Sequence, residues 1–230
     1  MLTDTPIYMG RDIHKDMPYD ITRLNSDCPF YYCLDFSKFD ASICHGMVDF
    51  AWNFIKDLLV FENEFDYLIY NYCRTLFQNN PIIMPDGRLY IVSAGIPSGS
   101  YFTQLIDSII NLQLINMCMY QHCQQMFPIK VLGDDSIFAT PESFATFEEL
   151  HSFFEQFGLS LSDKTVVTRN YLDIVFFGHN FYGSNVTRDE FTCLSLALHI
   201  DKEIAGPEET IIRIASLLYD CGFNSFSLMP

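Results

Sequence analysis

The segment "VLGDDSIF" (131–138) places two adjacent carboxylates, Asp134 and Asp135, between two short apolar runs. The flanking residues "PIKVL" and "SIFAT" predict the two arms of a hairpin, because Gly and Asp between them are ordinary turn formers. Neighbouring carboxylates are also the ligands that Mg²⁺ prefers. Short motifs match by accident, so this segment alone leaves both a turn and a metal site open.

The composition predicts a globular chain with a large core. Its 230 residues are 49% hydrophobic, enough for one large domain or two small ones, and no repeat or linker marks an internal boundary. No apolar stretch reaches the roughly 18 residues that span a bilayer, and the N-terminus lacks a basic-then-apolar signal, so we expect neither membrane insertion nor secretion. The net charge of -16 argues against nucleic acid binding over the whole surface, because phosphates select positive proteins.

The eight cysteines contain no C-x-x-C pair and have no regular histidine partners. The pattern therefore gives little support to a zinc site. We interpret them as reduced core residues of a protein in a cytosolic compartment.

Hydrophobic periodicity predicts an α+β fold in which an antiparallel sheet is backed by helices. We expect strands over 30–36, 128–132, 136–140, 165–168 and 173–181, and two short strands within 81–92 joined by a turn at 85–87. We expect helices over 42–60, 64–77, 101–122, 141–158 and 208–222.

Two carboxylates flank the end of the first predicted strand. Asp35 ends "FYYCLDF" (30–36), where it either shapes the exit turn or points into a cleft above the sheet. Asp40 precedes the first predicted helix, where Asp is a preferred N-cap, so capping is a strong alternative to a functional role. The turn between them would also place Asp40 beside Asp35.

The long predicted helix carries a polar stripe. Thr103, Asp107 and Asn111 are four residues apart and share one face of an otherwise apolar helix. Buried polar groups need partners, so this stripe faces a hydrogen-bond network, water or a ligand. A favourable helix dipole is the plainer explanation for Asp107. Just before the helix, Ser98 and Gly99 offer a hydroxyl and close backbone approach, which suit a phosphate or a sugar.

Together these residues suggest a two-metal site. Asp35, Asp134 and Asp135 would come from neighbouring strands, and two Mg²⁺ ions about 4 Å apart can bracket an in-line displacement at phosphorus.

The order of the motifs resembles the palm of viral RNA-dependent RNA polymerases. "LDFSKFD" (34–40) looks like the first palm motif, "PSGSYFTQLIDS" (97–108) like the second and "LGDDS" (132–136) like the Gly-Asp-Asp motif. "FGLSLSDKT" (157–165) resembles the fourth motif and "VFFGHNF" (175–181) the fifth, which contacts the primer strand. Five motifs in order over 30–181 are far more specific than any one of them. The sequence around the second motif, "GIPSGSYFTQLIDSIIN" (95–111), and the segment "EETIIRIASLLYDCG" (208–222) most resemble the corresponding sequences of partitivirus-type polymerases of double-stranded RNA viruses.

The resemblance implies roles for the metal site. Asp35 and Asp134 would be the principal Mg²⁺ ligands with Asp135 assisting, and Mn²⁺ is an alternative ion. The ions would activate the primer 3′-hydroxyl and hold the departing pyrophosphate, to which Lys164 would donate a proton; a solvated surface lysine is the plainer interpretation.

The resemblance also implies a nucleotide site. Asp40, Thr103 and Asp107 would read the ribose 2′-hydroxyl, with Ser98, Gly99 and Asn111 nearby. Position 107 is often Asn in such polymerases; an Asp there cannot donate to Asp40, so the two carboxylates would repel or share a proton.

The resemblance further implies the organisation of the chain. We expect a fingers and palm lead-in over 1–29, the palm over 30–181 and the start of a thumb over 182–230. The basic fingers motif and a full thumb are missing, which suggests a palm-centred fragment that is inactive in isolation and accounts for its acidic charge.

The implied partners are an RNA template and primer, ribonucleoside triphosphates and a viral capsid protein, with no membrane, in the host cytoplasm or inside the virion. Two alternatives remain open: a two-metal phosphodiesterase that uses the same aspartates, and a non-enzymatic acidic protein or decayed polymerase copy whose carboxylates are turns and caps.

Overall fold

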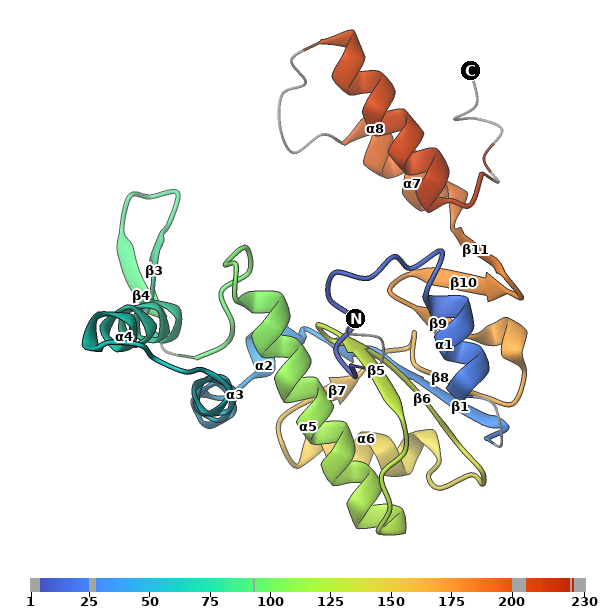
Figure 1. Cartoon of the computed structure of the whole chain (residues 1–230), viewed down its shortest axis with the longest axis horizontal. Helices are drawn as coiled ribbons and strands as arrows, with labels where there is room; N and C mark the ends of the chain where they lie inside the picture. Colours follow the sequence, from blue (N-terminus) through green and yellow to red (C-terminus); the bar gives the residue numbers. More distant parts are fainter. Residues whose placement is uncertain (1–4, 25–27, 93, 200–205, 224, 226–230) are drawn as a thin grey trace. The chain divides into compact units, whose positions relative to one another are not determined.

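The computed structural model describes residues 5–24, 28–92, 94–199, 206–223 and 225 (Figure 1). It is a mixed α+β fold with antiparallel strand pairs, which confirms the predicted class. The chain forms two compact units, the first made of Met1–Met9, Leu34–Ile137 and Ser143–Thr165, the second of Gly10–Cys33, Phe138–Glu142 and Val166–Pro230. The boundary crosses strands instead of following a linker, which explains why composition gave no sign of it. Each unit is described by itself.

The first unit holds most of the predicted helices and both predicted hairpins. Its helices are α2 (Phe39–Ser42), α3 (His45–Leu58), α4 (Glu64–Gln78), α5 (Thr103–Cys123) and α6 (Phe147–Glu155). Its strands are β2 (Phe36–Ser37), β3 (Asn80–Ile83), β4 (Leu89–Val92), β5 (Ile129–Leu132) and β7 (Ser160–Leu161), with the start of β6 (Asp135–Thr140).

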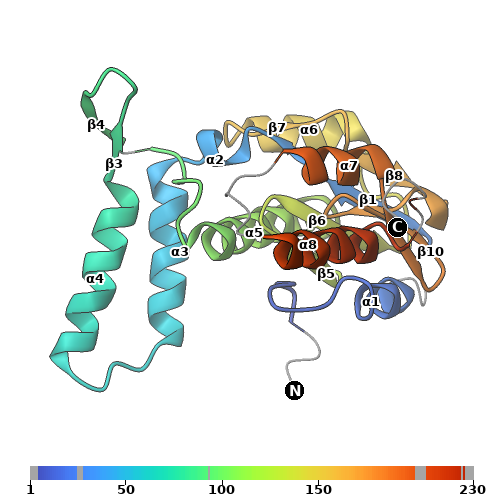
Figure 2. The same ribbon diagram turned by 90° about the horizontal axis from the view of Figure 1, so that it is seen from above.

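An aromatic cluster joins α3, α4 and the residue before α5. Trp52 is 1% exposed, and its ring lies 5.6 Å from Tyr70, 5.7 Å from Phe77 and 4.9 Å from Phe102 between centroids. The Tyr70 hydroxyl donates to the Trp52 carbonyl oxygen at 2.5 Å, so its polar end is satisfied within the core. Figure 2 shows α3 and α4 side by side, with the β3–β4 hairpin beyond the end of α4.

Helix α5 is the central element of the first unit. Its buried residues cover several faces and include three polar ones, Asp107, Ser108 and Asn111. It packs against β5, α3 and α6. The prediction of a long buried helix with a polar stripe is therefore confirmed, although Thr103 at its start is half-buried.

Helix α6 is shorter than predicted. We expected a helix from Pro141, but α6 begins at Phe147 because Thr146 accepts a hydrogen bond from the Glu149 amide while the Glu149 carboxylate accepts one from the Thr146 amide. This reciprocal capping box fixes the start six residues later than the proline suggested.

The second unit contains a sheet and two C-terminal helices. Its elements are α1 (Met17–Leu24), β1 (Phe30–Leu34), β8 (Val166–Thr168), a 3-10 turn (Tyr171–Asp173), β9 (Val175–Phe176), β10 (His179–Tyr182), β11 (Asn185–Arg188), α7 (Glu190–Leu198) and α8 (Pro207–Asp220). Strand β1 pairs with β8 with Tyr32 opposite Val167, and the Tyr32 ring stacks on Phe138 at 4.9 Å. Within this unit β1 and β8 form an antiparallel pair, and β11-β10-β9 forms a three-stranded sheet. Helices α1, α2 and α7 and strands β7 and β11 were not predicted.

Candidate active site

The predicted Gly-Asp-Asp turn joins β5 to β6 as a hairpin. Gly133 has φ of 64°, a left-handed conformation that favours glycine. Asp134 lies in the turn, and Asp135 is the first residue of β6. The turn interpretation of "VLGDDSIF" is therefore confirmed, and it leaves the function of the carboxylates to their surroundings.

Two polar side chains of α5 hold this turn. Asn111 is fully buried, and its Nδ2 donates to the carbonyl oxygens of Gly133 at 3.0 Å, Asp134 at 2.9 Å and, more weakly, Asp135 at 3.4 Å. The Gly133 amide donates to Ser108 Oγ at 2.8 Å. Since both residues bond the backbone, Asn111 positions the turn. Asn111 was predicted to lie near a nucleotide. In the structure its side-chain NH₂ group donates to the backbone of the turn instead.

Asp35 is anchored by the segment that carries the predicted lysine. Its backbone amide donates to Thr165 Oγ1 at 3.2 Å, while its carbonyl oxygen accepts from Thr165 Oγ1 at 3.0 Å and from the Ser162 amide at 2.9 Å. Ser162 Oγ also donates to Asp35 Oδ2. Asp35 thus lies between β1 and β2, with its backbone and carboxylate both held by one loop.

Asp40 lies inside α2 instead of capping a helix. The cap position belongs to Lys38, and Asp40 Oδ2 accepts a hydrogen bond from Ser98 Oγ at 2.6 Å. Ile96 also donates its amide to the Asp40 carbonyl oxygen at 2.8 Å. The N-cap interpretation of Asp40 is therefore wrong. The hydrogen bond from Ser98, in the loop before α5, links two of the predicted nucleotide-binding residues, Ser98 and Asp40.

Residues of α2 and the preceding Lys38, of α5 and of the Gly133–Asp134 turn line an open pocket of about 410 Å³ in the first unit. Its lining is mostly polar: Lys38, Phe39, Asp40, Ala41, Thr103, Gln104, Asp107, Gly133 and Asp134. Four predicted site residues thus share one pocket. Thr103 Oγ1 donates to the Pro97 carbonyl oxygen at 2.6 Å, which fixes the start of α5 to the Ser98 loop.

Asp107 is the most perturbed acid of the pocket. Burial, the neighbouring charges of Asp40 and Asp134 and a hydrogen bond with Asp40 raise the pKa of Asp107 to about 8. It is 4% exposed, and its Oδ1 is buried without a hydrogen-bond partner. The side chain therefore holds a proton at neutral pH, as the expected sharing between Asp40 and Asp107 requires.

Asp134 is also harder to ionise than an ordinary aspartate. Burial raises its pKa, as do the charges of Asp35 and Asp40, whereas a hydrogen bond to its own backbone and the charge of Lys164 lower it. The pKa of Asp134 thus responds to its burial and to the charges of Asp35, Asp40 and the exposed Lys164. Carboxylates that repel across a polar pocket fit a divalent cation, because a cation would relieve the repulsion.

The carboxylates of Asp35, Asp134 and Asp135 do not converge as a finished set of ligands. Among the described residues, three potential ligand atoms come within 4.8 Å of one another at His14, His179 and Asp220 instead. Gly99, with φ of 91°, is exposed in the loop before α5 and does not line the pocket.

Several residues of the site were missed by sequence reasoning. Ser108 hydrogen-bonds the turn at Gly133, and Ser162 hydrogen-bonds the carboxylate of Asp35. Lys38 and Gln104 line the pocket. Ser108 had a usable signal, a serine three residues before Asn111 on a buried helix. The partner of Ser162, Asp35, lies far away in the sequence. The position of Lys38 depends on its left-handed backbone conformation. No local pattern therefore indicated either residue.

The sequence matches the family of viral RNA-dependent RNA polymerases over residues 3–219, and the chain belongs to this family. The predicted family is therefore confirmed. Among the described helices, none combines the length and the apolar character needed to cross a membrane.

The similar proteins come from viruses with related polymerases. The chain is 28% identical over 214 residues to the RNA-directed RNA polymerase of Cryptosporidium parvum virus 1, covering 82% of this chain and 40% of that protein. It is 31% identical over 159 residues to that of White clover cryptic virus 1, covering 60% of this chain and 24% of that protein. The crystal structure of a human picobirnavirus RNA-dependent RNA polymerase shares the fold, with a TM-score of 0.73 and 17% identity over 89% of this chain and 41% of that one. The chain thus spans less than half of each relative.

Proposed function

We propose that the chain carries the palm of a polymerase that makes RNA on an RNA template by two-metal nucleotidyl transfer, for replication and transcription of a viral genome. The observation that carries this proposal is the pocket in which Asp40, Thr103, Asp107 and Asp134 meet in a member of this family. Its partners would be template and primer RNA, ribonucleoside triphosphates and a viral capsid protein, in the host cytoplasm or the virion.

Asp35 and Asp134 would hold divalent metal with Asp135 assisting. Their oxygens suit Mg²⁺ or Mn²⁺. Burial raises the pKa of Asp134, and so do the charges of Asp35 and Asp40, which a cation would offset. Bound metal would supply positive charge for the 3′-hydroxyl and the leaving pyrophosphate. The chain's own part is positional: Asn111 and Ser108 hold Asp134, while Ser162 and Thr165 hold Asp35.

The nucleotide would lie against the start of α5. Ser98 orients Asp40, and protonated Asp107 can donate to Asp40 or to a ribose hydroxyl, which removes the expected conflict between two carboxylates. Thr103 lines the same pocket. Lys164 is exposed and lowers the pKa of Asp134, which supports a place near the pyrophosphate and a role as proton donor.

The proposed domains follow the motifs. Residues 1–29 would lead in from the fingers, 30–181 would form the palm and 182–230, with α7 and α8, would begin the thumb. Since the chain covers 40% of the Cryptosporidium virus relative, the activity of a whole polymerase needs residues outside these 230, and we expect no synthesis from this chain alone.

The proposal is tested by primer extension. A longer polymerase that contains residues 1–230 should extend an RNA primer on an RNA template with Mg²⁺, and Asp134→Asn should abolish extension. Glu142→Gln is the matched control, because Glu142 is an exposed acid just beyond β6. Extension by Asp134→Asn at the wild-type rate would overturn the assignment. Cleavage of RNA without extension would instead favour a phosphodiesterase.

Metal binding tests the site in the 230-residue chain itself. Calorimetry with Mg²⁺ and Mn²⁺ should detect weak binding that is lost in the double variant Asp35→Asn/Asp134→Asn. Equal heats from the wild type and the double variant would mean that these aspartates form no metal site in this chain.

A further inference from the structure

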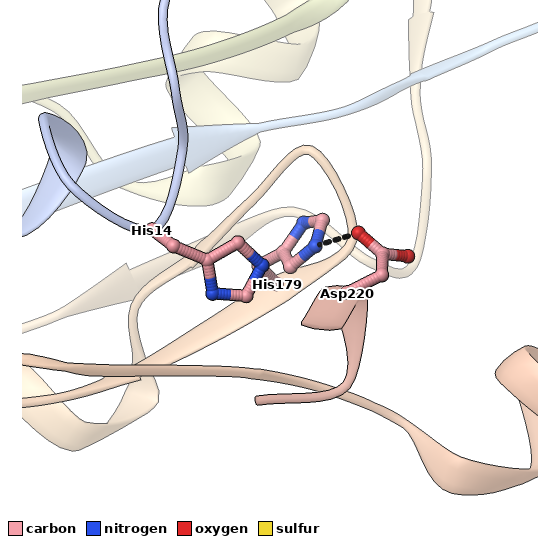
Figure 3. Close-up of side chains that lie close together, drawn as sticks. All are labelled: His14, His179 and Asp220. Atoms are coloured by element: carbon pink, nitrogen blue, oxygen red, sulfur yellow. Dashed lines mark hydrogen bonds and ion pairs between the residues drawn. The ribbon is translucent and has the colours of Figure 1, made fainter. Parts of the chain in front are cut away.

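Two histidines and an aspartate meet in the second unit, far from one another in the sequence. His14 belongs to the loop before α1, His179 to β10 and Asp220 to the end of α8 (Figure 3). One potential ligand atom from each lies within 4.8 Å of the other two. Two atoms bound to one zinc ion at about 2.1 Å each are at most about 4.2 Å apart, so only a small closure is needed.

His179 is oriented as a metal ligand would be. It is 1% exposed, and its Nδ1 lies 2.7 Å from the Phe177 carbonyl oxygen, which only accepts, so Nδ1 carries a proton. Its Nε2 lies 2.9 Å from Asp220 Oδ1. A backbone carbonyl that holds the far nitrogen is the usual support of a metal-bound imidazole.

His14 completes the group with an unused nitrogen. Its Nε2 is buried and has no hydrogen-bond partner. Its ring is held 4.5 Å from the Tyr219 ring and 5.6 Å from the His179 ring between centroids. A buried ring nitrogen without a partner costs free energy unless it binds something.

The two carboxylate oxygens of Asp220 have different partners, one being His179 and the other Arg188. Its Oδ2 accepts from Arg188 Nη1 at 2.7 Å, which fixes the carboxylate and leaves Oδ1 facing His179. Burial would raise the pKa of Asp220, but hydrogen bonds from His179 and Arg188 outweigh it and lower the pKa to about 2.

We propose that His14 Nε2, His179 Nε2 and Asp220 Oδ1 bind one divalent transition-metal ion, with zinc the expected one, that ties the N-terminal loop to β10 and α8. Two imidazoles and one carboxylate suit zinc and its neighbours better than Mg²⁺, which prefers oxygen ligands. All three ligands lie in the second unit, and we expect the ion to have a structural role there.

The test is zinc binding to the metal-stripped 230-residue chain in excess Mg²⁺, which occupies oxygen-only sites. The informative variant is His14→Phe, which keeps a ring beside Tyr219 and removes the ligand nitrogen. His45→Phe is the matched control, because His45 is an exposed histidine of α3 in the first unit. Calorimetry measures affinity and stoichiometry, and thermal unfolding with and without zinc measures the effect on stability.

We expect the wild type and His45→Phe to bind one zinc per chain and to unfold at a higher temperature with zinc. His14→Phe should bind at least about tenfold more weakly and lose this temperature shift, while its metal-free unfolding temperature stays close to that of the wild type. Affinity should also fall as the pH drops through the range where imidazoles take up protons. Equal zinc affinity in His14→Phe and the wild type, or no binding to the wild type, would overturn the proposal.

Discussion

Asn111 holds Asp134 in place through its backbone: the Asn111 side-chain amide lies 2.9 Å from the Asp134 carbonyl oxygen and 3.0 Å from that of Gly133. The side chain is fully buried at the middle of α5, so the geometry of the acidic turn is tied to the position of that helix. Stability and catalysis should therefore respond together when this contact is changed.

Asn111→Leu should destabilise the chain by about 2 kcal/mol, because buried carbonyl oxygens of the turn lose a donor and Leu cannot replace it. Urea unfolding of the 230-residue chain measures this loss. In an active longer polymerase the same change should slow primer extension, since Asp134 is no longer held.

Asn116→Leu is the control for this effect, because Asn116 is a half-buried residue of the same helix. It should leave extension near the wild-type rate. Wild-type stability and activity in Asn111→Leu would show that the Gly133–Asp134 turn keeps its conformation without the hydrogen bonds from Asn111.

Ser108→Ala should cost about 1 to 3 kcal/mol, because the buried Gly133 amide loses its acceptor. Ser108 and Asn111 support the same turn, so the double variant should be less destabilised than the sum of the single ones. Denaturant unfolding of the four proteins measures this coupling. Strict additivity would mean that the two contacts act independently.

The raised pKa of Asp107 predicts a pH dependence of stability in the absence of divalent metal. Between the ordinary pKa of 3.8 and the folded value of about 8, the unfolded chain has lost the proton that the folded chain keeps. The contribution of Asp107 to the free energy of unfolding therefore falls as the pH rises through this window, by an amount on the order of a few kcal/mol, and is constant above it.

Asp107→Asn should remove this pH dependence and stabilise the metal-free chain at pH above the ordinary pKa. Unfolding free energies measured across the window, for the wild type and the variant side by side, check it. Parallel curves for the two proteins would show that Asp107 ionises normally.

Thr165→Val should destabilise the chain by about 1 to 2 kcal/mol, because the Asp35 amide loses its acceptor and the Asp35 carbonyl oxygen loses one donor. It should also weaken Mg²⁺ binding, since Asp35 is less firmly held. Thr75→Val is the control, because the exposed Thr75 hydroxyl only bonds back to its own helix. Calorimetry and thermal unfolding check both effects, and a Thr165→Val chain that binds Mg²⁺ as the wild type does would contradict the positioning role.

The sequence was sufficient where structure depends on neighbours along the chain. The β5–β6 hairpin, the long helix α5 and the order of the motifs follow from turn residues, apolar periodicity and spacing, which are local. It was insufficient for α6, whose start depends on the Thr146–Glu149 capping box. It also gave no sign of the two units, because their boundary crosses strands.

The sequence by itself determined the family and the α+β class. The tertiary structure decided which partner each side chain has: Asn111 holds the turn, Ser162 bonds Asp35, Ser98 bonds Asp40, and His14 meets His179. The two residues of each pair come from distant segments of the chain. No local sequence pattern singles out these pairings from other possible ones. Only the packed chain, in which most buried polar groups find a partner, selects among them.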